Sequence, residues 1–567
     1  MRTRLRIISG FILLLALMFF IKLYSLQVIH ANDFAERADR QYQRPNNIVF
    51  NRGNIFFQGQ DGTVISAATL KSGFTLIINP KIIQQNKNAE DIYAKLSSLV
   101  TLDYADFMMR AGKVNDSYEE IKKKVDESTG EKITAFGLKG VSLYREKWRY
   151  YPGNDLAAQT VGFLGYKGDE YAGRYGLERY YEDVLKRSSD SVYVNFFAEI
   201  FSGIKKNVIE GEKMEGDIVT TIDPDTQSYL QDTLDGIKKR YSSESAGGII
   251  MNPKTGEIYA MALTPTFDPN DLSRETNPAI FRNDLVESVR EMGSIIKPLT
   301  MAVGIDLGKV SASTTYNDTG SVTLNNKTIS NFDKKGRGVI TLQYALSKSL
   351  NTGFAFVAKQ VGNDALSEYF YNFGLGEKTG VDLPNEASGI VDNLKSPREI
   401  EHATAAFGQG IAMTPIETTR ALAAIANGGY LVKPYLVKKI NYRVGYSKDI
   451  QPEKGKRVIK EETAHAVMDM LVYNVDNSLL DGKAKNPRYS IGAKTGTAQI
   501  AAPGGGYYDD RYLHSFVGMV PANDPKFIVF MYTVYPKGVQ YASETLAQPF
   551  IDMTKYLINY YQIPPDR

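Results

Sequence analysis

The longest apolar run of the chain lies at its N-terminus. Residues 7–26 are nearly all apolar, and roughly 20 residues rising about 1.5 Å each match a bilayer core about 30 Å thick. Lys22 interrupts the run near one end, where a lysine side chain can reach the polar interface. No small-residue cleavage site follows, so the pattern favours a transmembrane anchor over a cleaved signal peptide. Three arginines precede the run and no comparable basic cluster follows it, which predicts a cytoplasmic N-terminus and a chain that otherwise lies outside the membrane.

Residues 31–215 alternate short apolar segments with polar, tyrosine-rich stretches. The pattern predicts a helix over 89–100, part of another helix over 121–125, and helical structure over 180–185. Turn-forming glycine, asparagine and aspartate residues bound short strands in the first part of this region. No group of residues here suggests chemistry. We therefore interpret the region as a structural pedestal that holds the following domain away from the membrane.

Residues 216–567 combine strand-like and helical patterns. Predicted strands lie at 217–223, 247–251, 257–263, 490–494, 514–520 and 527–534, and predicted helices begin near 224, dominate 294–425 and close the chain at 546–561. Sequence-distant strands with an all-helical block between them predict an α/β or α+β domain. The expected protein is multidomain α+β, with a cytoplasmic tail and anchor over 1–30, the pedestal over 31–215 and this domain over 216–567.

Composition narrows the classes of function. The 567 residues are 43% hydrophobic and 23% charged, which is typical of folded globular protein. The 67 basic and 64 acidic residues give a net charge of +3, too balanced for a nucleic-acid surface. Cysteine is absent, and the four histidines are scattered outside any metal-binding pattern. We expect no metal, no cofactor, no thiol chemistry and no nucleic-acid partner.

The strongest candidate chemistry lies in the stretch Glu-Met-Gly-Ser-Ile-Ile-Lys-Pro at 291–298. Residues three apart share a helix face, so Lys297 lies one turn beyond Ser294 and the two groups can exchange a proton. Pro298 costs least in a first helical turn, which predicts a helix start near Ser294. Free amides and the helix dipole there favour an oxyanion formed when the serine attacks a carbonyl. Taken alone, the tetrad would be read as a helix start with a surface lysine; the same spacing at 202–205 predicts only a solvated loop.

A second segment with candidate catalytic residues contains Ser349 and Asn351. The Ser349 hydroxyl could pass a proton between a base and a leaving group, and the Asn351 amide could hold a substrate peptide bond with one donor and one acceptor. Taken alone, Ser-x-Asn is also typical of a helix cap or a turn.

The third piece is Lys-Thr-Gly, which occurs at 254–256, 378–380 and 494–496. The first two fall in a predicted hairpin turn and a predicted loop, so we interpret them as structural. The third ends a predicted strand and continues to Thr497. An edge strand that carries a cation, two hydroxyls and a glycine can align an extended substrate and bind its carboxylate.

In this order, with roughly 55 and 145 residues between them, the three pieces resemble the catalytic signature of penicillin-binding proteins and serine β-lactamases. Segments that share the resemblance are Arg52-Gly53, Gly173 to Glu178, Thr221-Ile222-Asp223, Asp268-Pro269-Asn270, Gly408-Gln409-Gly410 and Asn427-Gly428-Gly429. Since no glycan-polymerising domain precedes the pedestal, the chain is similar to a class B, monofunctional enzyme. Residues 514–518 and 521–525 favour the division-specific branch over the elongation branch. Departures from the family pattern are Met292, where proline is common, and Leu350, where serine is common.

The resemblance implies an antiparallel sheet flanked by helices, a dimerisation-type pedestal, and a set of roles. Ser294 would attack the penultimate D-alanine carbonyl of a peptidoglycan stem peptide, with Lys297 as base and Ser349 as proton relay. The substrate-binding residues would be Asn351, Lys494, Thr495, Gly496 and Thr497, and the N–H groups of Ser294 and Thr497 would form the oxyanion hole. Lys297 must then be neutral, and both burial and repulsion from Lys494 would lower its pKa from about 10.4.

The implied partners are peptidoglycan stem peptides, β-lactam antibiotics, the lipid bilayer, and a membrane glycan polymerase with other division proteins. The implied location is a bacterial cell membrane, with the catalytic domain outside. Four alternatives remain open at this point: an elongation-specific transpeptidase, a membrane-anchored serine β-lactamase, a β-lactam sensor, and a cell-wall scaffold with dispensable catalysis. A β-lactamase would turn penicillin over rapidly, whereas a transpeptidase would hold a long-lived adduct.

Overall fold

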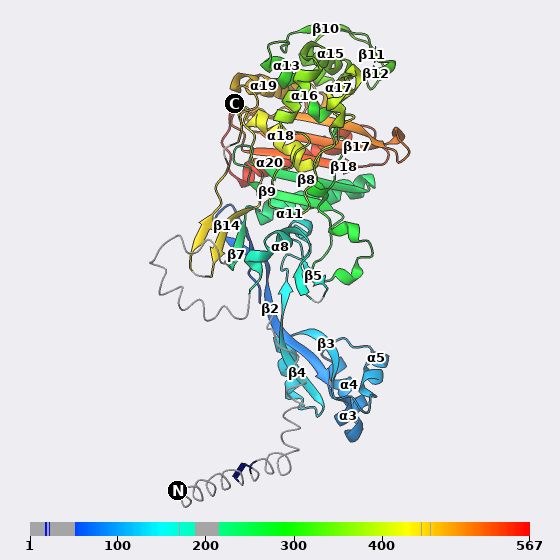
Figure 1. The fold of residues 1–567 in the computed structure, drawn as a ribbon, viewed down its shortest axis with the longest axis vertical. Coiled ribbons are helices and arrows are strands. Elements are labelled where there is room, and N and C mark those ends of the chain that lie inside the picture. The colour runs from blue at the N-terminus through cyan, green and yellow to red at the C-terminus, as the bar shows by residue number, and fades with distance from the viewer. Residues whose placement is uncertain are drawn as a thin grey trace, which may run out of the picture. The chain divides into compact units, whose positions relative to one another are not determined.

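The computed structural model describes residues 51–168, 170–187, 215–443, 445–453 and 455–567, together with Met18, Phe19 and Lys22. The described chain divides into two compact units, Leu70–Trp148 and the combination of Arg52–Thr69 with Arg149–Arg567. Figure 1 labels many of their elements. None of the described helices has the length and apolar character needed to cross a membrane. Apart from those three residues, the predicted anchor at 7–26 lies outside the described part, and the division at residue 215 stays a prediction.

The unit Leu70–Trp148 packs helices against a small sheet. Its elements are β2 (Val64–Ile78), which also enters the other unit, α3 (Pro80–Asn86), α4 (Ala89–Ser97), α5 (Tyr104–Ala111), β3 (Glu119–Asp126), α6 (Glu127–Ala135) and β4 (Val141–Tyr150). Leu76 of β2 packs with Ile92 and Phe107 of the helices in a separate core. The helix predicted over 89–100 is confirmed by α4.

The helix predicted over 121–125 is wrong, because this segment belongs to strand β3. Ile121 and Val125 are four residues apart, a spacing that suits one helix face. In the structure Val125 pairs with Phe74 of β2 in an antiparallel ladder. Pairing with a distant strand therefore overrides the local pattern.

A second group of short elements lies within the larger unit. These elements are β1 (Ile55–Gln58), α7 (Ala158–Val161), β5 (Leu164–Lys167), β6 (Glu170–Gly173), α8 (Gly176–Tyr180), α9 (Glu182–Leu185), β7 (Gly216–Thr220), β14 (Val437–Tyr442) and β15 (Ser447–Asp449). Five strands lie in the order β15-β14-β7-β1-β2. The helical structure predicted over 180–185 and the strand predicted over 217–223 are confirmed, with shifted ends.

A buried ionic cluster joins two motifs that are far apart in the sequence. Glu178 has no exposed surface and accepts hydrogen bonds from the side chains of Arg52 at 2.7 Å and Arg149 at 2.6 Å. Arg149 also donates to the carbonyl oxygen of Gly53 at 2.7 Å. Burial alone would raise the pKa of Glu178, but the two guanidinium groups hold it below its ordinary value. The Arg52-Gly53 and Gly173–Glu178 segments therefore form one structural feature.

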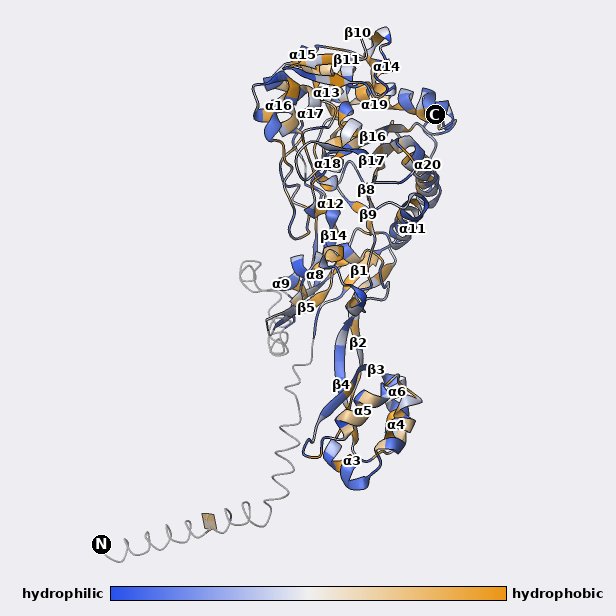
Figure 2. Ribbon diagram, turned by 90° about the vertical axis from the view of Figure 1, so that its right-hand side faces the viewer, coloured by the Kyte–Doolittle hydropathy of each residue, from blue (hydrophilic) through white to orange (hydrophobic). Residues whose placement is uncertain are grey.

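The main sheet is antiparallel and has five strands in the order β16-β17-β18-β8-β9. Its strands are β16 (Gly492–Ala501), β17 (Tyr507–Val520), β18 (Phe527–Val534), β8 (Ser245–Met251) and β9 (Ile258–Thr264), and helices α11 (Pro224–Tyr241) and α20 (Ala542–Tyr560) cover one face. Figure 2 shows both helices along one side of the sheet, with polar residues prominent on them. The predicted strands and the predicted edge position of β16 are confirmed, and β16 extends past residue 494 where the prediction stopped.

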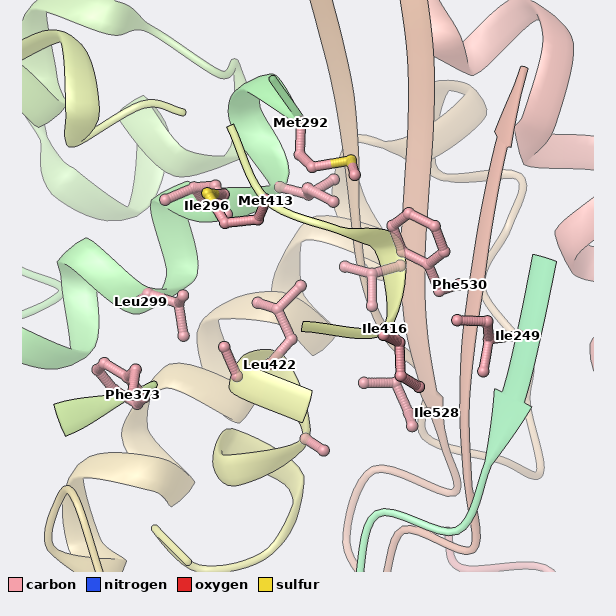
Figure 3. Close-up of a cluster of buried hydrophobic side chains, with 14 of the residues drawn as sticks. Ile249, Met292, Ile296, Leu299, Phe373, Met413, Ile416, Leu422, Ile528 and Phe530 are labelled. Carbon is pink, nitrogen blue, oxygen red and sulfur yellow. The ribbon is translucent and has the colours of Figure 1, made fainter. Parts of the chain in front are cut away.

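The other face of the sheet packs against a helical layer that carries the candidate nucleophile. Neighbouring residues of one strand alternate between the faces, so Ile249 points to this layer and Ile250 to α11 and α20. Figure 3 shows Ile249 and Phe530 of the sheet near Met292 and Ile416 of the helical layer. The helices of this layer include α12 (Asp284–Glu287), α13 (Lys297–Asp306) and α18 (Pro415–Ala426).

The sequence pattern predicted an all-helical block between 294 and 425, and this prediction is wrong because the block contains four short strands. These strands follow α13 and are β10 (Thr315–Asp318), β11 (Ser321–Leu324), β12 (Lys327–Ser330) and β13 (Gly338–Thr341). The helices that come after them are α14 (Leu342–Ser347), α15 (Asn351–Val361), α16 (Asn363–Asn372) and α17 (Glu399–Ala405). β11 and β12 form a hairpin whose turn, Asn325-Asn326, has φ of 46° and 62°. Two residues with positive φ are the signature of a tight hairpin, and asparagine tolerates this conformation.

The remaining described elements are one helix that follows β15 and several short 3-10 turns. They are α19 (Glu461–Asn477), η3 (Leu272–Arg274), η4 (Pro278–Phe281), η5 (Gly293–Ile296), η6 (Asp392–Lys395) and η7 (Leu479–Gly482). Of these, η5 matters most, because it contains Ser294 and runs directly into α13.

Candidate active site

The candidate nucleophile lies at the start of a helix, as the sequence predicts. Ser294 is half-buried in η5, and Pro298 occupies the first turn of α13. Gly293, with φ of +63°, begins the 3-10 turn in a conformation that other residues rarely adopt. Its N–H donates to the carbonyl oxygen of Gly408 at 3.1 Å. The turn is therefore fixed on its N-terminal side by a loop that lies more than a hundred residues later.

Strands β17 and β16 support the same turn from the sheet side. The Ser515 hydroxyl donates to the carbonyl oxygen of Met292 at 2.7 Å. A Cβ atom added at Gly496 would lie 2.6 Å from that oxygen and 2.3 Å from the Ser515 hydroxyl. Gly496 is thus required for the close approach of β16 to the nucleophile turn. The sequence had suggested only a role in substrate alignment.

Lys297 is fully buried, and its amine points at Ser349 and Asn351. Nζ lies 2.7 Å from the carbonyl oxygen of Ser349, 3.2 Å from the Ser349 hydroxyl and 3.0 Å from Oδ1 of Asn351. Burial and the neighbouring charge of Lys494 lower the pKa of Lys297 well below its ordinary value. The direction and both causes agree with the expectation drawn from the sequence.

In its neutral form, the Lys297 amine would keep one lone pair for a hydroxyl. A neutral amine has two N–H donors, and the Ser349 carbonyl and the Asn351 carbonyl oxygen can only accept. Those two acceptors use both donors. The lone pair is then available to take a proton from a serine hydroxyl. The Ser294 hydroxyl itself makes no hydrogen bond within the described residues.

Lys494 completes the polar group from the edge strand. It is 2% exposed, and Nζ donates to the Ser349 hydroxyl at 3.0 Å and to the carbonyl oxygen of Thr495 at 2.8 Å. Burial lowers the pKa of Lys494 to about 7. The Ser349 hydroxyl therefore lies within hydrogen-bond distance of both Lys297 and Lys494, and three sequence-distant pieces meet at this one oxygen.

The substrate-binding candidates divide into two sets. Thr495 and Thr497 are half-buried and share one face of β16, whereas the buried Lys494 and Gly496 face the helical layer. The Thr497 hydroxyl accepts from the N–H of Ala542 at 3.1 Å, at the start of α20.

Both polar atoms of the Asn351 amide already make a hydrogen bond in this structure. Its Nδ2 donates to the carbonyl oxygen of Ser330 at 3.0 Å, and its Oδ1 accepts from Lys297. A substrate peptide bond would have to replace or share these contacts, so the predicted role of Asn351 in holding the substrate stays a prediction.

The other histidine, lysine and serine candidates lie elsewhere or outside the described residues. His514 is buried between Thr545 and the carbonyl oxygen of Gln540, and burial lowers its pKa to about 4. Lys254 pairs with Asp524 beside the turn between β8 and β9. Residues 202–205 lie outside the described part. Among the described residues, no group of three acidic or histidine side chains is placed to hold a metal ion.

Sequence reasoning missed the contacts that hold the site in place. The carbonyl oxygens of Ser330 and Gly408 and the Ser515 hydroxyl were not candidates. Backbone oxygens leave no trace in residue identity, which explains the first two. Gly408 does belong to a Gly-Gln-Gly segment that was recognised, and its φ of +81° is the physical reason for the glycine.

Comparison with known proteins agrees with this geometry. Residues 246–554 match the penicillin-binding protein transpeptidase domain, and residues 47–199 match the penicillin-binding protein dimerisation domain. The chain belongs to the penicillin-binding protein transpeptidase family. All the residues described above, from Ser294 to Thr497, lie inside the matched transpeptidase region.

Three relatives illustrate the similarity. The chain is 31% identical to Stage V sporulation protein D of Bacillus subtilis over 88% of this chain and 78% of that protein. It is 26% identical to peptidoglycan D,D-transpeptidase FtsI of Buchnera aphidicola, over 96% and 93% respectively. The crystal structure of penicillin binding protein 3 of Mycobacterium tuberculosis with ampicillin is 28% identical, with a TM-score of 0.65, and covers 74% of this chain and 91% of that one.

Proposed function

We propose that this penicillin-binding protein is a peptidoglycan D,D-transpeptidase that crosslinks stem peptides through an acyl-enzyme on Ser294. One observation carries the assignment: the Ser349 hydroxyl lies 3.2 Å from the amine of Lys297 and 3.0 Å from that of Lys494, and Lys297 sits one helical turn beyond Ser294. This arrangement supplies a nucleophile, a base and a proton relay for acyl transfer.

The proposed first step is acylation. The Ser294 oxygen attacks the penultimate D-alanine carbonyl, and its proton passes to the neutral amine of Lys297. The negative charge that forms on the carbonyl oxygen is stabilised by the N–H groups of Ser294 and Thr497. The carbon–nitrogen bond to the terminal D-alanine then breaks, and the leaving amine receives a proton through Ser349.

The second step transfers the acyl group to another strand. An amine from a neighbouring stem peptide attacks the ester carbonyl and loses a proton, which returns through the same relay to the Ser294 oxygen as the ester bond breaks. Lys494, Thr495 and Thr497 bind the carboxylate of the donor peptide, and Gly496 lets β16 approach the nucleophile turn. A β-lactam presents a similar acyl group and carboxylate, and it acylates the same serine.

Fluorescent-penicillin labelling of the full chain tests the assignment. The expected result is strong labelling of wild type, none of Ser294→Ala, and undiminished labelling of Ser202→Ala, the matched serine of the other Ser-x-x-Lys tetrad. Lys297→Ala should slow acylation at neutral pH by at least about 100-fold, the usual scale of a lost general base. Labelling that survives Ser294→Ala would overturn the proposal, and release of the label within seconds would favour a β-lactamase.

The proposed setting is a cell membrane, with residues 7–26 as anchor, residues 31–215 as pedestal and residues 216–567 as an outer catalytic domain. The partners would be the lipid bilayer, a membrane glycan polymerase and other division proteins, and the role would be septal wall synthesis. The family resemblance of residues 514–525 supports this branch over the elongation branch. Depletion of the protein should therefore block septation; loss of cell width control with normal septa would favour elongation.

A second candidate role follows from one relative. The similarity to Stage V sporulation protein D at 31% identity supports a transpeptidase that acts in spore formation. Deletion separates the two roles, because a sporulation enzyme would be dispensable for growth and a septal enzyme would not.

A further inference from the structure

Ser349 and Asn351 lie at the start of a helix whose own N-cap residue makes no side-chain hydrogen bond. Helix α15 begins at Asn351, and its N-cap residue, Leu350, has no side chain that can accept a hydrogen bond from the first turn. Asn331, at the end of the β11–β12 hairpin, supplies the missing acceptor. Its Oδ1 lies 3.2 Å from the N–H of Thr352 and 3.1 Å from the Thr352 hydroxyl. The cap of α15 therefore comes from a different element.

A buried carboxylate holds this external cap. Asp318, at the end of β10, is 2% exposed. Its Oδ1 accepts from Nδ2 of Asn331 at 2.9 Å, from the Thr352 hydroxyl at 2.9 Å and from the N–H of Gly320 at 3.0 Å. The guanidinium of Arg337, 3.7 Å from the other oxygen, supplies a countercharge.

The Thr352 hydroxyl has one proton, which fixes the direction of the network. Its possible acceptors are Asp318, Asn331 and the Tyr316 hydroxyl, and a charged acceptor makes the stronger hydrogen bond. The proton therefore goes to Asp318, and Tyr316, whose hydroxyl lies 3.2 Å away, donates to Thr352.

The network continues without a break into the candidate active site. Ser330 and Asn331 are consecutive, and they contact the consecutive residues Asn351 and Thr352. The carbonyl oxygen of Ser330 accepts from Nδ2 of Asn351, so the other amide atom, Oδ1, must face the amine of Lys297. An amide turned by 180° would place donor against donor at Lys297 and acceptor against acceptor at Ser330.

We propose that Asp318, Asn331 and Thr352 are positioning residues that fix the orientation of the Asn351 amide and, through it, the amine of Lys297. The proposal deepens the transpeptidase function and rests on it. The segment β10–β13 then helps to position the catalytic groups. Its buried carboxylate, Asp318, holds Asn331, and the neighbouring Ser330 carbonyl orients the Asn351 amide so that Oδ1 faces Lys297.

Two substitutions test the network in the full chain. Asp318→Asn keeps the shape but removes the charge, and Thr352→Val removes the hydroxyl, with Thr352→Ser as the conservative variant that retains it. Both disruptive variants should lower the second-order rate constant of penicillin acylation by about 10- to 100-fold, the scale expected when a reacting group is displaced by about 1 Å. Thr352→Ser should restore the rate to within a few-fold of wild type.

The pH profile separates positioning from simple loss of stability. The Asn351 oxygen favours the charged form of Lys297, so its loss should lower the pKa of that amine and move the acid limb of the acylation profile to lower pH, while the plateau falls. A matched control is Asp382→Asn, a buried carboxylate that accepts from the N–H groups of Leu436 and Val437 and from the Tyr181 hydroxyl, outside the site. This control should lower Tm without moving the acid limb.

Failure of the positioning proposal and failure of the transpeptidase assignment would give different results. Labelling that survives Ser294→Ala would defeat the transpeptidase assignment. If Ser294→Ala abolishes labelling but Asp318→Asn and Thr352→Val are folded and acylate at the wild-type rate with an unmoved acid limb, the positioning proposal is overturned. If Asp318→Asn does not fold, the Thr352→Val and Thr352→Ser pair decides.

Discussion

Ser349 adopts a left-handed backbone conformation, with φ of +55°. Helix α14 ends just before it with hydrogen bonds from the N–H of Ser349 to Leu346 and from the N–H of Leu350 to Ala345. Helices that end in this pattern usually carry glycine at this position, because a Cβ atom is strained there. The chain instead carries the hydroxyl that both lysines contact, and the proposed proton relay gives a reason for accepting the strain.

This strain predicts a difference between two inactive variants. Ser349→Gly removes the strain, whereas Ser349→Ala keeps it, so urea denaturation should find the glycine variant more stable than the alanine variant by about 0.5–1 kcal/mol. Both variants lack the shared hydroxyl and should acylate slowly with penicillin. Equal stabilities would show that the left-handed conformation is relaxed in the folded protein.

Lys494 predicts an alkaline limit to acylation. Its pKa is lowered to about 7 by burial, and its proposed role in binding a carboxylate requires the charged form. The acylation rate constant should therefore fall as pH rises through about 7, while the neutral base, Lys297, sets a limb at lower pH. Lys494→Arg keeps its charge at every accessible pH and should move the alkaline limb upward, even if the overall rate drops. A wild-type profile that stays flat from pH 7 to pH 9 would contradict this role.

At the scale of elements, helix α18 carries a buried carboxylate in its first turn. Glu417 is 1% exposed and forms a capping box with Thr414. It also accepts from the N–H of Gly376 at 2.6 Å. Burial raises the pKa of Glu417 to about 7, against a weaker opposing effect of these hydrogen bonds and of Arg420. The folded protein therefore binds this proton more tightly than the unfolded chain does.

The consequence is a pH-dependent contribution to stability. The contribution is fully present below the unfolded pKa near 4.5 and is lost as pH rises through about 7. The change should be on the order of 3 kcal/mol. Glu417→Gln keeps a capping side chain without a titrating group, so the difference in unfolding free energy between wild type and variant should shift across this range. Denaturant titrations at pH 5 and pH 8 measure it; an unchanged difference would contradict the prediction.

The local hydrophobic pattern predicts elements whose residues are buried, such as β18. It misses elements that form because one strand pairs with another, such as β3 and the β11–β12 hairpin. The strand predicted at 527–534 coincides with β18, because all eight residues are buried and the apolar run shows it. Strand β3 was predicted as a helix because its apolar spacing suits either structure. The β11–β12 hairpin was missed, although the Asn325-Asn326 turn was a usable signal.

At the scale of the whole molecule, the sequence likewise predicts the site residues but not the residues that hold them in place. Ser294, Lys297, Ser349 and Lys494 could be grouped from the sequence because their order and residue types resemble a known signature. That the two lysines meet at the Ser349 hydroxyl follows only from the fold. The residues that hold them act through backbone atoms or through long-range hydrogen bonds, such as that from Asn351 to Ser330. No local pattern encodes such contacts, so the sequence could not reveal the Asp318 network.

The strand order of the main sheet constrains how the molecule is made. Thr533 of β18 donates to the carbonyl oxygen of Ser245 in β8, 288 residues earlier, so synthesis delivers β8 and β9 long before their partner. Until then the edge of β8 that pairs with β18 has no partner, and intermediates with unpaired strand edges are prone to aggregate. A premature stop codon ahead of β18 would therefore divide the sheet into two unconnected hairpins, β16 with β17 and β8 with β9, because β18 is the strand that lies between them.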